Sequence, residues 1–234
     1  MEGKGKGRPL TVAIDGPAGA GKSTVARSVA QKLGYLYLDT GAMYRAITLK
    51  ALQQNVPLDD EGALTRLACE TVLEWQAPQA GIPGGPKLYM DGVDVSEAIR
   101  HPRVTKAVSL VARVPGVRQR LIQLQRRFAE QGGVVVDGRD IGTVVLPHAE
   151  CKFYLTASLE ERARRRQREL AQQGMPAEME EVKSALAWRD TIDSGREISP
   201  LRPAEDAVII DTTGRSVEEV VEQIYSLCKE KEAL

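Results

Sequence analysis

The sequence is poor in cysteine. Its 234 residues include three cysteines, Cys69, Cys151 and Cys228, which are far apart in the chain and form no CxxC pair. This spacing argues against a disulfide framework and against a structural zinc site. It fits a reducing compartment, so we expect a cytoplasmic protein.

The sequence also lacks an excess of charge of either sign, long apolar runs and many aromatic residues. Its 32 basic and 32 acidic residues cancel, so no field of the whole molecule attracts nucleic acid or an anionic membrane. No run of 18 apolar residues occurs, and the N-terminal MEGKGKGRP has no apolar segment behind its charges, so neither a membrane span nor a signal peptide is expected. Aromatic residues make up 4%, which leaves few platforms for stacking bases. Any anion binding must therefore be local.

The chain instead alternates short apolar runs with helical patterns, which is typical of a parallel sheet covered by helices. Two S-x-x-E patterns, Ser158 with Glu161 and Ser216 with Glu219, mark helix starts. The runs predicted as central strands are 11–15, 35–39, 133–137, 151–155 and 207–211. Four of the five end in aspartate, so acidic groups collect at the strand ends where α/β sheets bind ligands.

Residues 60–130 are predicted to be an insertion between strands of this sheet. Within them, 77–86 has the composition of a loop. The following KLYMDGVDV, 87–95, predicts a strand and a turn, with Asp91 and Gly92 as the turn residues.

The most informative stretch is IDGPAGAGKST, in which Gly16 and Gly21-Lys22-Ser23 fit G-x-x-x-x-G-K-[ST] between a strand and a helical pattern. Glycines let backbone N–H groups turn around phosphate oxygens, and a helix N-terminus adds partial positive charge. Lys22 would reach the β- and γ-phosphates, and the Ser23 hydroxyl would ligate Mg²⁺. The alternative is a glycine-rich turn that only connects strand to helix.

A second phosphate site is indicated by LDTGAMYRAI, residues 38–47. We expect a turn at Thr40 and Gly41, with Thr40 as the N-cap of a helix that carries Tyr44 and Arg45. A helix N-terminus with an arginine suits an anion. The alternative is a capped amphipathic helix whose Tyr44 and Arg45 face solvent.

The stretch VVVDGRDIGTVVLP, 134–147, runs from an apolar strand into Asp137-Gly138-Arg139-Asp140. Two carboxylates and a guanidinium are thereby placed where the sheet opens to ligand. An internal ion-pair turn is an equally good interpretation of this loop alone.

Further on, AWRDTIDSGREISPL places Arg189, Asp193 and Arg196 at i, i+4 and i+7, and hence along one helix face. Such spacing is also common in surface ion-pair rows. Taken with the preceding segments, it offers several arginines interleaved with aspartates. A mononucleotide is a ligand of that kind.

Four segments, DGPAGAGKST, LDTGAMYR, VVDGRDIGTVV and RDTIDSGREISPL, resemble the bacterial cytidylate (CMP) kinases in order and spacing across nearly the whole chain. The resemblance implies an α/β, three-layer P-loop NTPase fold with a parallel five-stranded sheet. It implies one kinase domain over 1–234, with an acceptor-binding insert at about 70–115 and a helical lid at about 157–175. The implied reaction moves the γ-phosphoryl group of Mg-ATP to CMP or dCMP, in pyrimidine nucleotide metabolism.

The same resemblance implies roles for individual residues. The ATP phosphate loop would be Gly16, Pro17, Ala18, Gly19, Ala20, Gly21, Lys22, Ser23 and Thr24. The catalytic set would be Lys22 with the arginines that hold the acceptor phosphate, Arg45, Arg139 and Arg196. The cytosine ring would be read by Ser109, Arg118 and Asp140. The base and sugar would be lined by Thr40, Tyr44, Arg189 and Asp193, where Thr40 replaces the serine of some family members.

The basic run 162–168 has three interpretations. On a helix Arg162, Arg165 and Arg166 share one face, and by resemblance they belong to the lid that closes over ATP. Because Glu160, Glu161 and Glu169 flank the run, it is alternatively a solvated, ion-paired helix. A small nucleic-acid patch is the third possibility.

The chemistry explains why no general base stands out. The acceptor is a phosphate monoester, already an anionic nucleophile near neutral pH, and His101 and His148 both adjoin prolines in predicted loops, so we expect structural or solvated roles for them. Asp140 beside Arg118 would complement cytosine, whereas a carboxylate facing the O4 atom of uracil is repelled.

Other function classes stay open at this point. A nucleotide-dependent switch would use the same phosphate loop, although the chain has no N-K-x-D motif. A kinase for another small acceptor, such as UMP or dTMP, is the nearest rival. We expect a monomer that binds ATP and CMP or dCMP and has neither nucleic acid nor membrane as a partner.

Overall fold

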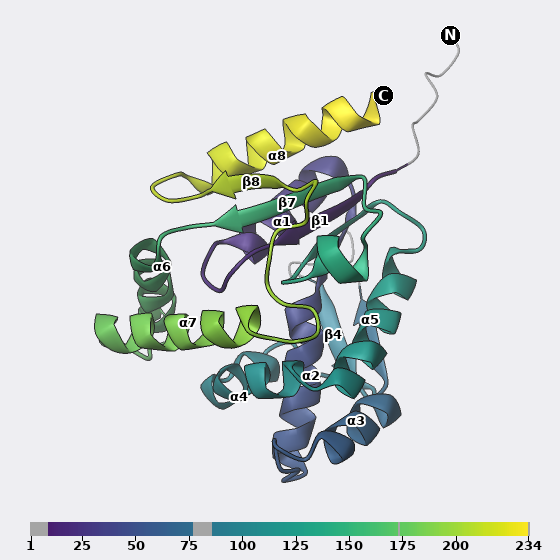
Figure 1. The fold of residues 1–234 in the computed structure, drawn as a ribbon, viewed down its shortest axis with the longest axis vertical. Coiled ribbons are helices and arrows are strands. Elements are labelled where there is room, and N and C mark those ends of the chain that lie inside the picture. The colour runs from purple at the N-terminus through teal and green to yellow at the C-terminus, as the bar shows by residue number, and fades with distance from the viewer. Residues whose placement is uncertain (1–8, 77–85, 173, 234) are drawn as a thin grey trace. The chain divides into compact units, whose positions relative to one another are not determined.

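A computed structural model describes residues 9–76, 86–172 and 174–233 (Figure 1). The chain forms two compact units. The core unit comprises Met1–Leu38 with Gln131–Leu234, and the insert unit comprises Asp39–Glu130. The insertion predicted at 60–130 falls in the insert unit, which begins earlier in the chain, at Asp39. The description of the chain as one kinase domain with an insert and a lid stays a prediction.

The core unit is built on a five-stranded sheet. Its strands, in spatial order, are β2 (Leu36–Asp39), β6 (Val134–Asp137), β1 (Thr11–Asp15), β7 (Cys151–Thr156) and β8 (Val208–Asp211). β1 runs parallel to β6 and β7, and β7 runs parallel to β8. All five predicted strands are confirmed. Because parallel strands share one carboxyl edge, Asp15 and Asp137 end neighbouring strands at the same edge.

Two helices bury the apolar side chains of one sheet face. α1 (Lys22–Leu33) contributes Val25 and Val29, and α8 (Val217–Glu232) contributes Ile224, to a cluster with the strands. At the start of α8 the predicted capping box is confirmed, since Ser216 and Glu219 bond each other's backbone N–H groups.

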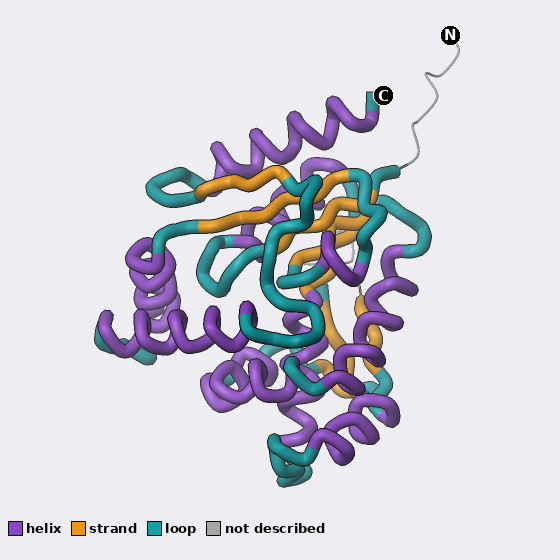
Figure 2. Tube along the Cα trace, in the orientation of Figure 1, coloured by secondary structure: helices purple, strands orange, loops and turns teal. Residues whose placement is uncertain are grey.

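The remaining helices of the core unit follow β6 and β7. A short helix, η2 (Ile141–Val145), follows the Asp137-Gly138-Arg139-Asp140 loop. α6 (Leu159–Gln172) and α7 (Met179–Ser194) are neighbouring helices (Figure 2). They pack on each other through an apolar cluster that includes Ala163 of α6 with Val182 and Leu186 of α7. α6 lies in the segment predicted as the lid, and the Glu161 N–H bonds Ser158 at its start.

The insert unit combines helices with a small antiparallel sheet. Its elements are α2 (Thr40–Gln53), α3 (Glu61–Glu70), β3 (Leu73–Gln76), β4 (Lys87–Met90), β5 (Val93–Asp94), η1 (Ala98–Arg100), α4 (Pro102–Ala112) and α5 (Pro115–Ala129). β4 pairs with both β3 and β5, which confirms the predicted strand and turn. The predicted loop at 77–86 lies, except for Pro86, outside the described residues. In the part of the chain that the structure describes, no helix has the length and apolar character of a membrane span.

Candidate functional site

The glycine loop follows β1 and leads into α1, as the sequence predicts. Gly16 has φ +145°, and a Cβ there would lie 2.0 Å from the backbone oxygen of Leu155, so only glycine fits. Lys22 is buried, and its ammonium donates a 2.7 Å hydrogen bond to the Pro17 carbonyl across the loop. Burial and then the Arg139 charge lower the pKa of Lys22, while Asp137 acts in the opposite direction. The lysine is therefore held inside the loop.

Ser23, the next residue of α1, contacts the end of β6. Its hydroxyl donates a 2.7 Å hydrogen bond to Asp137 Oδ2, and Oδ1 of the same carboxylate accepts from the Tyr37 hydroxyl at 3.2 Å. A hydroxyl beside a carboxylate is the kind of oxygen pair that Mg²⁺ prefers. Asp137 was not among the predicted metal ligands. The sequence signal for Asp137 was VVVD, an apolar run that ends in aspartate. Only the sheet order, with β6 next to β1, brings that aspartate beside the glycine loop.

Asp193 gathers two of the arginines predicted to serve catalysis. Its carboxylate, only 2% exposed, accepts from Arg139 Nε at 2.9 Å and from Arg196 Nη2. Burial raises the pKa of Asp193, but the charges of Arg139, Arg196 and Arg189 outweigh it and hold the pKa below its ordinary value. Segments far apart in the sequence thus meet at one carboxylate.

The predicted helix face through Arg189, Asp193 and Arg196 is wrong for its last member. α7 ends at Ser194, so Arg196 lies beyond the helix. The chain turns back instead, because the Leu201 N–H donates to the Asp193 carbonyl at 2.8 Å. Arg196 therefore reaches Asp193 through a loop rather than along a helix.

Arg162, the first of the predicted lid arginines, holds the glycine loop. It is buried, and its guanidinium donates to the Ala18 carbonyl at 3.1 Å and to Asp190 of α7 at 2.7 Å. The Ala157 carbonyl accepts a third bond at 3.1 Å. One side chain thus ties the glycine loop to both α6 and α7.

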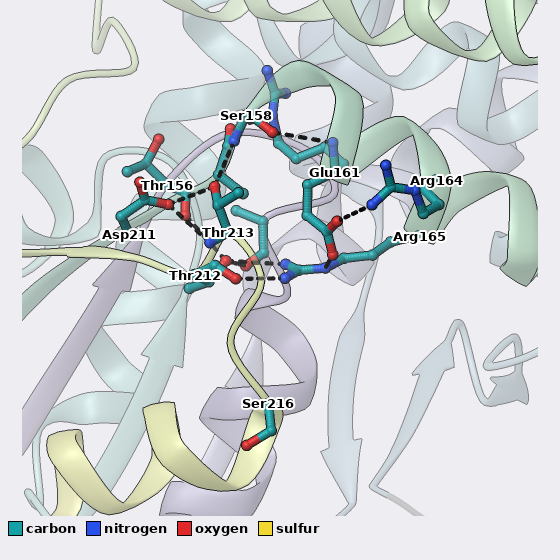
Figure 3. Close-up of polar contacts among 12 residues, drawn as sticks. Thr156, Ser158, Glu161, Arg164, Arg165, Asp211, Thr212, Thr213 and Ser216 are labelled. Atoms are coloured by element: carbon teal, nitrogen blue, oxygen red, sulfur yellow. Dashed lines mark hydrogen bonds and ion pairs between the residues drawn. The ribbon is translucent and has the colours of Figure 1, made fainter.

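Arg165 lies in a second network beside the loop (Figure 3). It donates to the Thr212 hydroxyl at 3.0 Å and to the Thr212 carbonyl at 2.7 Å, and it pairs with Glu161. The Thr212 hydroxyl lies 3.3 Å from the Ala20 carbonyl, to which it donates. The end of β8 is thereby fastened to both α6 and the glycine loop.

The third lid arginine, Arg166, pairs with Glu169 at 2.9 Å, and Arg164 pairs with Glu161 at 2.8 Å. The arginines predicted to share one face therefore have separate partners. Arg164 and Arg166 therefore fit the alternative of a solvated, ion-paired helix. Arg162 does not, because it is buried against the glycine loop.

In the insert unit, α2 begins one residue earlier than predicted. Asp39 is its N-cap and accepts the Ala42 N–H at 2.9 Å, so Thr40 is the first helical residue and the predicted Thr40 cap is wrong. The same carboxylate pairs with Arg45 at 3.0 Å. Asp39 can do both because a carboxylate offers two oxygens, whereas a threonine hydroxyl offers one.

Arg118 and Tyr44, two further predicted residues of this unit, lie against each other. The Arg118 guanidinium lies 5.5 Å from the centroid of the Tyr44 ring, and it donates to the Ala112 carbonyl at 3.1 Å. Arg118 is 2% exposed, and Ser109 of α4 is buried as well. Tyr44 itself is 8% exposed, so the alternative in which its side chain faces solvent is excluded.

The two histidines lie where the sequence analysis expected structural or solvated roles. His101 accepts the Arg103 N–H through Nδ1 at the start of α4, and His148 is exposed. Among the described residues, no group of three or more His, Cys, Asp and Glu side chains could hold a metal ion.

Comparisons with known proteins identify the family of this chain. The family model for cytidylate kinase matches residues 12–230. The cytidylate kinase of a Geobacillus species is 53% identical over 222 residues, covering 95% of this chain and 97% of its own, and that of Desulforamulus reducens is 55% identical over 215 residues, covering 92% and 95%. A crystal structure of an uncharacterized protein from Eubacterium ventriosum shares the fold at a TM-score of 0.52, with 11% identity and coverage of 94% and 98%. The chain belongs to the cytidylate kinase family.

Proposed function

We propose that this protein transfers the γ-phosphoryl group of ATP to CMP, giving CDP and ADP, and that it accepts dCMP as well. The observation that carries the proposal is the glycine loop between β1 and α1, in a chain that matches the cytidylate kinase model over residues 12–230. The alternative function, a nucleotide-dependent switch, rests on the glycine loop alone.

The donor side of the reaction belongs to the core unit. Backbone N–H groups of Gly16–Thr24 would surround the triphosphate, and Lys22 would leave the Pro17 carbonyl to reach its β- and γ-oxygens. Ser23 and Asp137 fit Mg²⁺, because a hydroxyl and a carboxylate lie 2.7 Å apart beside the loop. The ion would neutralise charge on the β- and γ-phosphates as the phosphoryl group moves.

The acceptor needs to be held rather than activated. Its phosphate is already anionic, so Arg45, Arg139 and Arg196 would bind and orient it in line with the γ-phosphoryl group. In the structure Asp39 pairs with Arg45, and Asp193 pairs with the other two. These carboxylates keep the guanidinium groups oriented, and a guanidinium carries five N–H donors in all, whose fork geometry suits phosphate oxygens.

Base and sugar selection would fall to the other predicted residues. Asp140 and Arg118 would complement cytosine, with Ser109 also on the ring. Thr40, Tyr44, Arg189 and Asp193 would line the base and sugar without requiring a 2′-hydroxyl group, which is why dCMP is included. Arg162 and Arg165 would keep α6 against the loop, and together with Arg166 they would belong to the lid that excludes water.

We also propose that the protein is a cytoplasmic monomer. Its three cysteines carry free thiols, which suits a reducing compartment. Size-exclusion chromatography with light scattering should give a single species of 25.5 kDa. A species of twice that mass would contradict the monomer.

The experiment that tests the function measures ADP release from Mg-ATP with CMP, dCMP, UMP, dTMP, AMP, GMP or no acceptor. Release that depends on CMP and dCMP supports both the reaction and the cytosine pocket. Preference for another acceptor would keep the kinase and reject the roles of Asp140 and Arg118. Release that is independent of every acceptor would reject the proposal in favour of a nucleotide-hydrolysing switch.

A further inference from the structure

Asp15, the last residue of β1, lies directly before the glycine loop and faces away from solvent. Its carboxylate is 3% exposed. Oδ1 accepts the backbone N–H of Ile141 at 2.8 Å, and Oδ2 accepts that of Gly142 at 2.8 Å. Both bonds are short and charge-assisted, and they join segments 126 and 127 residues apart.

The two N–H groups need an acceptor from elsewhere. Ile141 and Gly142 open η2, and the first N–H groups of any helix have no partner within it. Asp140, at the N-cap position, makes no side-chain cap bond. Asp15, at the end of β1, therefore caps η2.

Gly142 lies where a large side chain would be crowded. A Cβ at that position would lie 3.2 Å from Cδ of Lys152, which is tight, and 3.4 Å from Oδ2 of Asp15, which is an ordinary contact distance. A side chain that branches beyond Cβ would therefore have to displace the lysine, the carboxylate or the Gly142 backbone itself.

Keeping the Asp15 carboxylate ionised costs free energy, because the group is buried. Burial raises the pKa of Asp15 to about 7, and the charge of Asp140 adds to the increase. The two backbone N–H groups and the charge of Lys22 lower the pKa of Asp15. Burial and the charge of Asp15 in turn raise the pKa of Tyr154. A group kept against such a desolvation cost, beside a phosphate loop, is more typical of a functional site than of a simple cap.

The segment that Asp15 holds carries residues of the acceptor side. Arg139 and Asp140 immediately precede η2, and Arg139 is the residue that pairs with Asp193. We propose that Asp15 is a positioning residue for acceptor binding: by holding Ile141 and Gly142, it fixes the Arg139-Asp140 segment relative to the glycine loop without touching either nucleotide. The inference goes beyond the proposed function and rests on it for the identity of the acceptor.

The test replaces Asp15 by asparagine, which has one acceptor oxygen and would turn an NH₂ group toward the second N–H. Hydrogen exchange of the amides of 141–142, measured by mass spectrometry on short peptides, should accelerate about tenfold or more in Asp15→Asn. The KM for CMP should rise about tenfold, while the KM for ATP changes by less than about threefold.

Two further variants keep the test decisive if Asp15→Asn folds poorly. Gly142→Val alters no charge, but its two methyl groups extend beyond a Cβ that would already lie 3.4 Å from Asp15 Oδ2. It should separate the amide from the carboxylate and so reproduce both the faster exchange and the higher KM for CMP. Asp59→Asn, at an exposed position of the insert unit, is the matched control and should change neither.

The two readouts separate the inference from the proposed function. Faster exchange with an altered KM for CMP supports the positioning role. Unchanged exchange in both variants would overturn it, whatever the substrate proves to be. Faster exchange with equal loss of CMP and ATP affinity would also overturn it, because Asp15 would then be a structural cap of the whole site. If the wild type does not phosphorylate CMP, the proposed function fails, while the exchange result still decides whether Asp15 holds η2.

Discussion

The hydroxyl of Ser23 donates a 2.7 Å hydrogen bond to Asp137 Oδ2, and this bond joins the first turn of α1 to the end of β6. Neither residue is close to the other in sequence. Their meeting places a hydroxyl and a carboxylate beside the glycine loop, where the Mg²⁺ of a nucleoside triphosphate lies in P-loop enzymes. A substitution of Asp137 should therefore change the Mg²⁺ concentration that the reaction requires.

Asp137→Asn should keep the size of the side chain but remove the negative charge that would hold the ion. We expect kcat to fall about 100-fold or more and the Mg²⁺ concentration for half-maximal rate to rise. Steady-state ADP release over a series of Mg²⁺ concentrations measures both. An unchanged Mg²⁺ requirement would exclude Asp137 from the metal site.

Ser23→Ala tests the other member of the pair and should raise the Mg²⁺ requirement in the same direction. Its matched control is Ser184→Ala, at an exposed position of α7, which should leave the titration unchanged.

Arg45→Ala should weaken CMP binding while leaving ATP binding nearly intact, because Arg45 belongs to the insert unit and pairs with Asp39. Loss of a charge-assisted contact to phosphate should lower kcat/KM for CMP roughly 100-fold, equivalent to about 3 kcal/mol. Calorimetry with a non-hydrolysable ATP analogue provides the second measurement. Equal loss of ATP affinity would contradict the assignment, and Arg66→Ala, at an exposed position of α3, is the control.

The strands and the glycine loop could be predicted because they depend on local pattern. A short apolar run with β-branched residues between turn residues favours a strand through its own composition, and the loop motif specifies its own turn. Thr40 shows where local reasoning fails. Threonine is a good N-cap, but Asp39 directly before it takes the position, and its second oxygen also binds Arg45.

Contacts that depend on how the chain turns or on which segments meet could not be predicted from helix spacing. Arg196 reaches Asp193 because the chain folds back after Ser194, which helix periodicity does not reveal. Cys151 and Cys228 are far apart in the sequence, yet β7 and α8 bring both into one apolar cluster. The residues were visible in the sequence, but the partners required the fold.

Asp193→Asn should destabilise the protein as well as impair it. Removing the negative charge leaves Arg139 and Arg196 without their buried counter-charge, which typically costs about 3–5 kcal/mol. Urea unfolding at pH 7 measures the loss. Because the pKa of folded Asp193 lies below the ordinary 3.8, its stabilisation is complete at higher pH and is lost as pH falls through the folded pKa.

The penalty of Asp193→Asn should therefore shrink below about pH 4. Asp59→Asn, exposed and distant in sequence from these arginines, should show a small penalty at every pH. A penalty for Asp193→Asn that is equally small at pH 7 would mean that the two arginines do not depend on this carboxylate.

Asp15→Asn should have an effect on stability that depends on pH in the opposite sense. Burial raises the pKa of Asp15 from 3.8 to about 7, so the folded protein binds this proton more tightly than the unfolded chain does. The contribution of Asp15 to stability therefore falls as pH rises from about 4 to about 7, whereas asparagine does not titrate. The free energy of unfolding of Asp15→Asn, relative to the wild type, should become more favourable by on the order of 2 kcal/mol between pH 5 and pH 8. Urea unfolding at several pH values measures this difference, and a difference that stays constant would show that Asp15 does not titrate in this range. A variant that is relatively more stable at pH 8 but binds CMP less well would show that the buried charge is retained for function at a cost in stability.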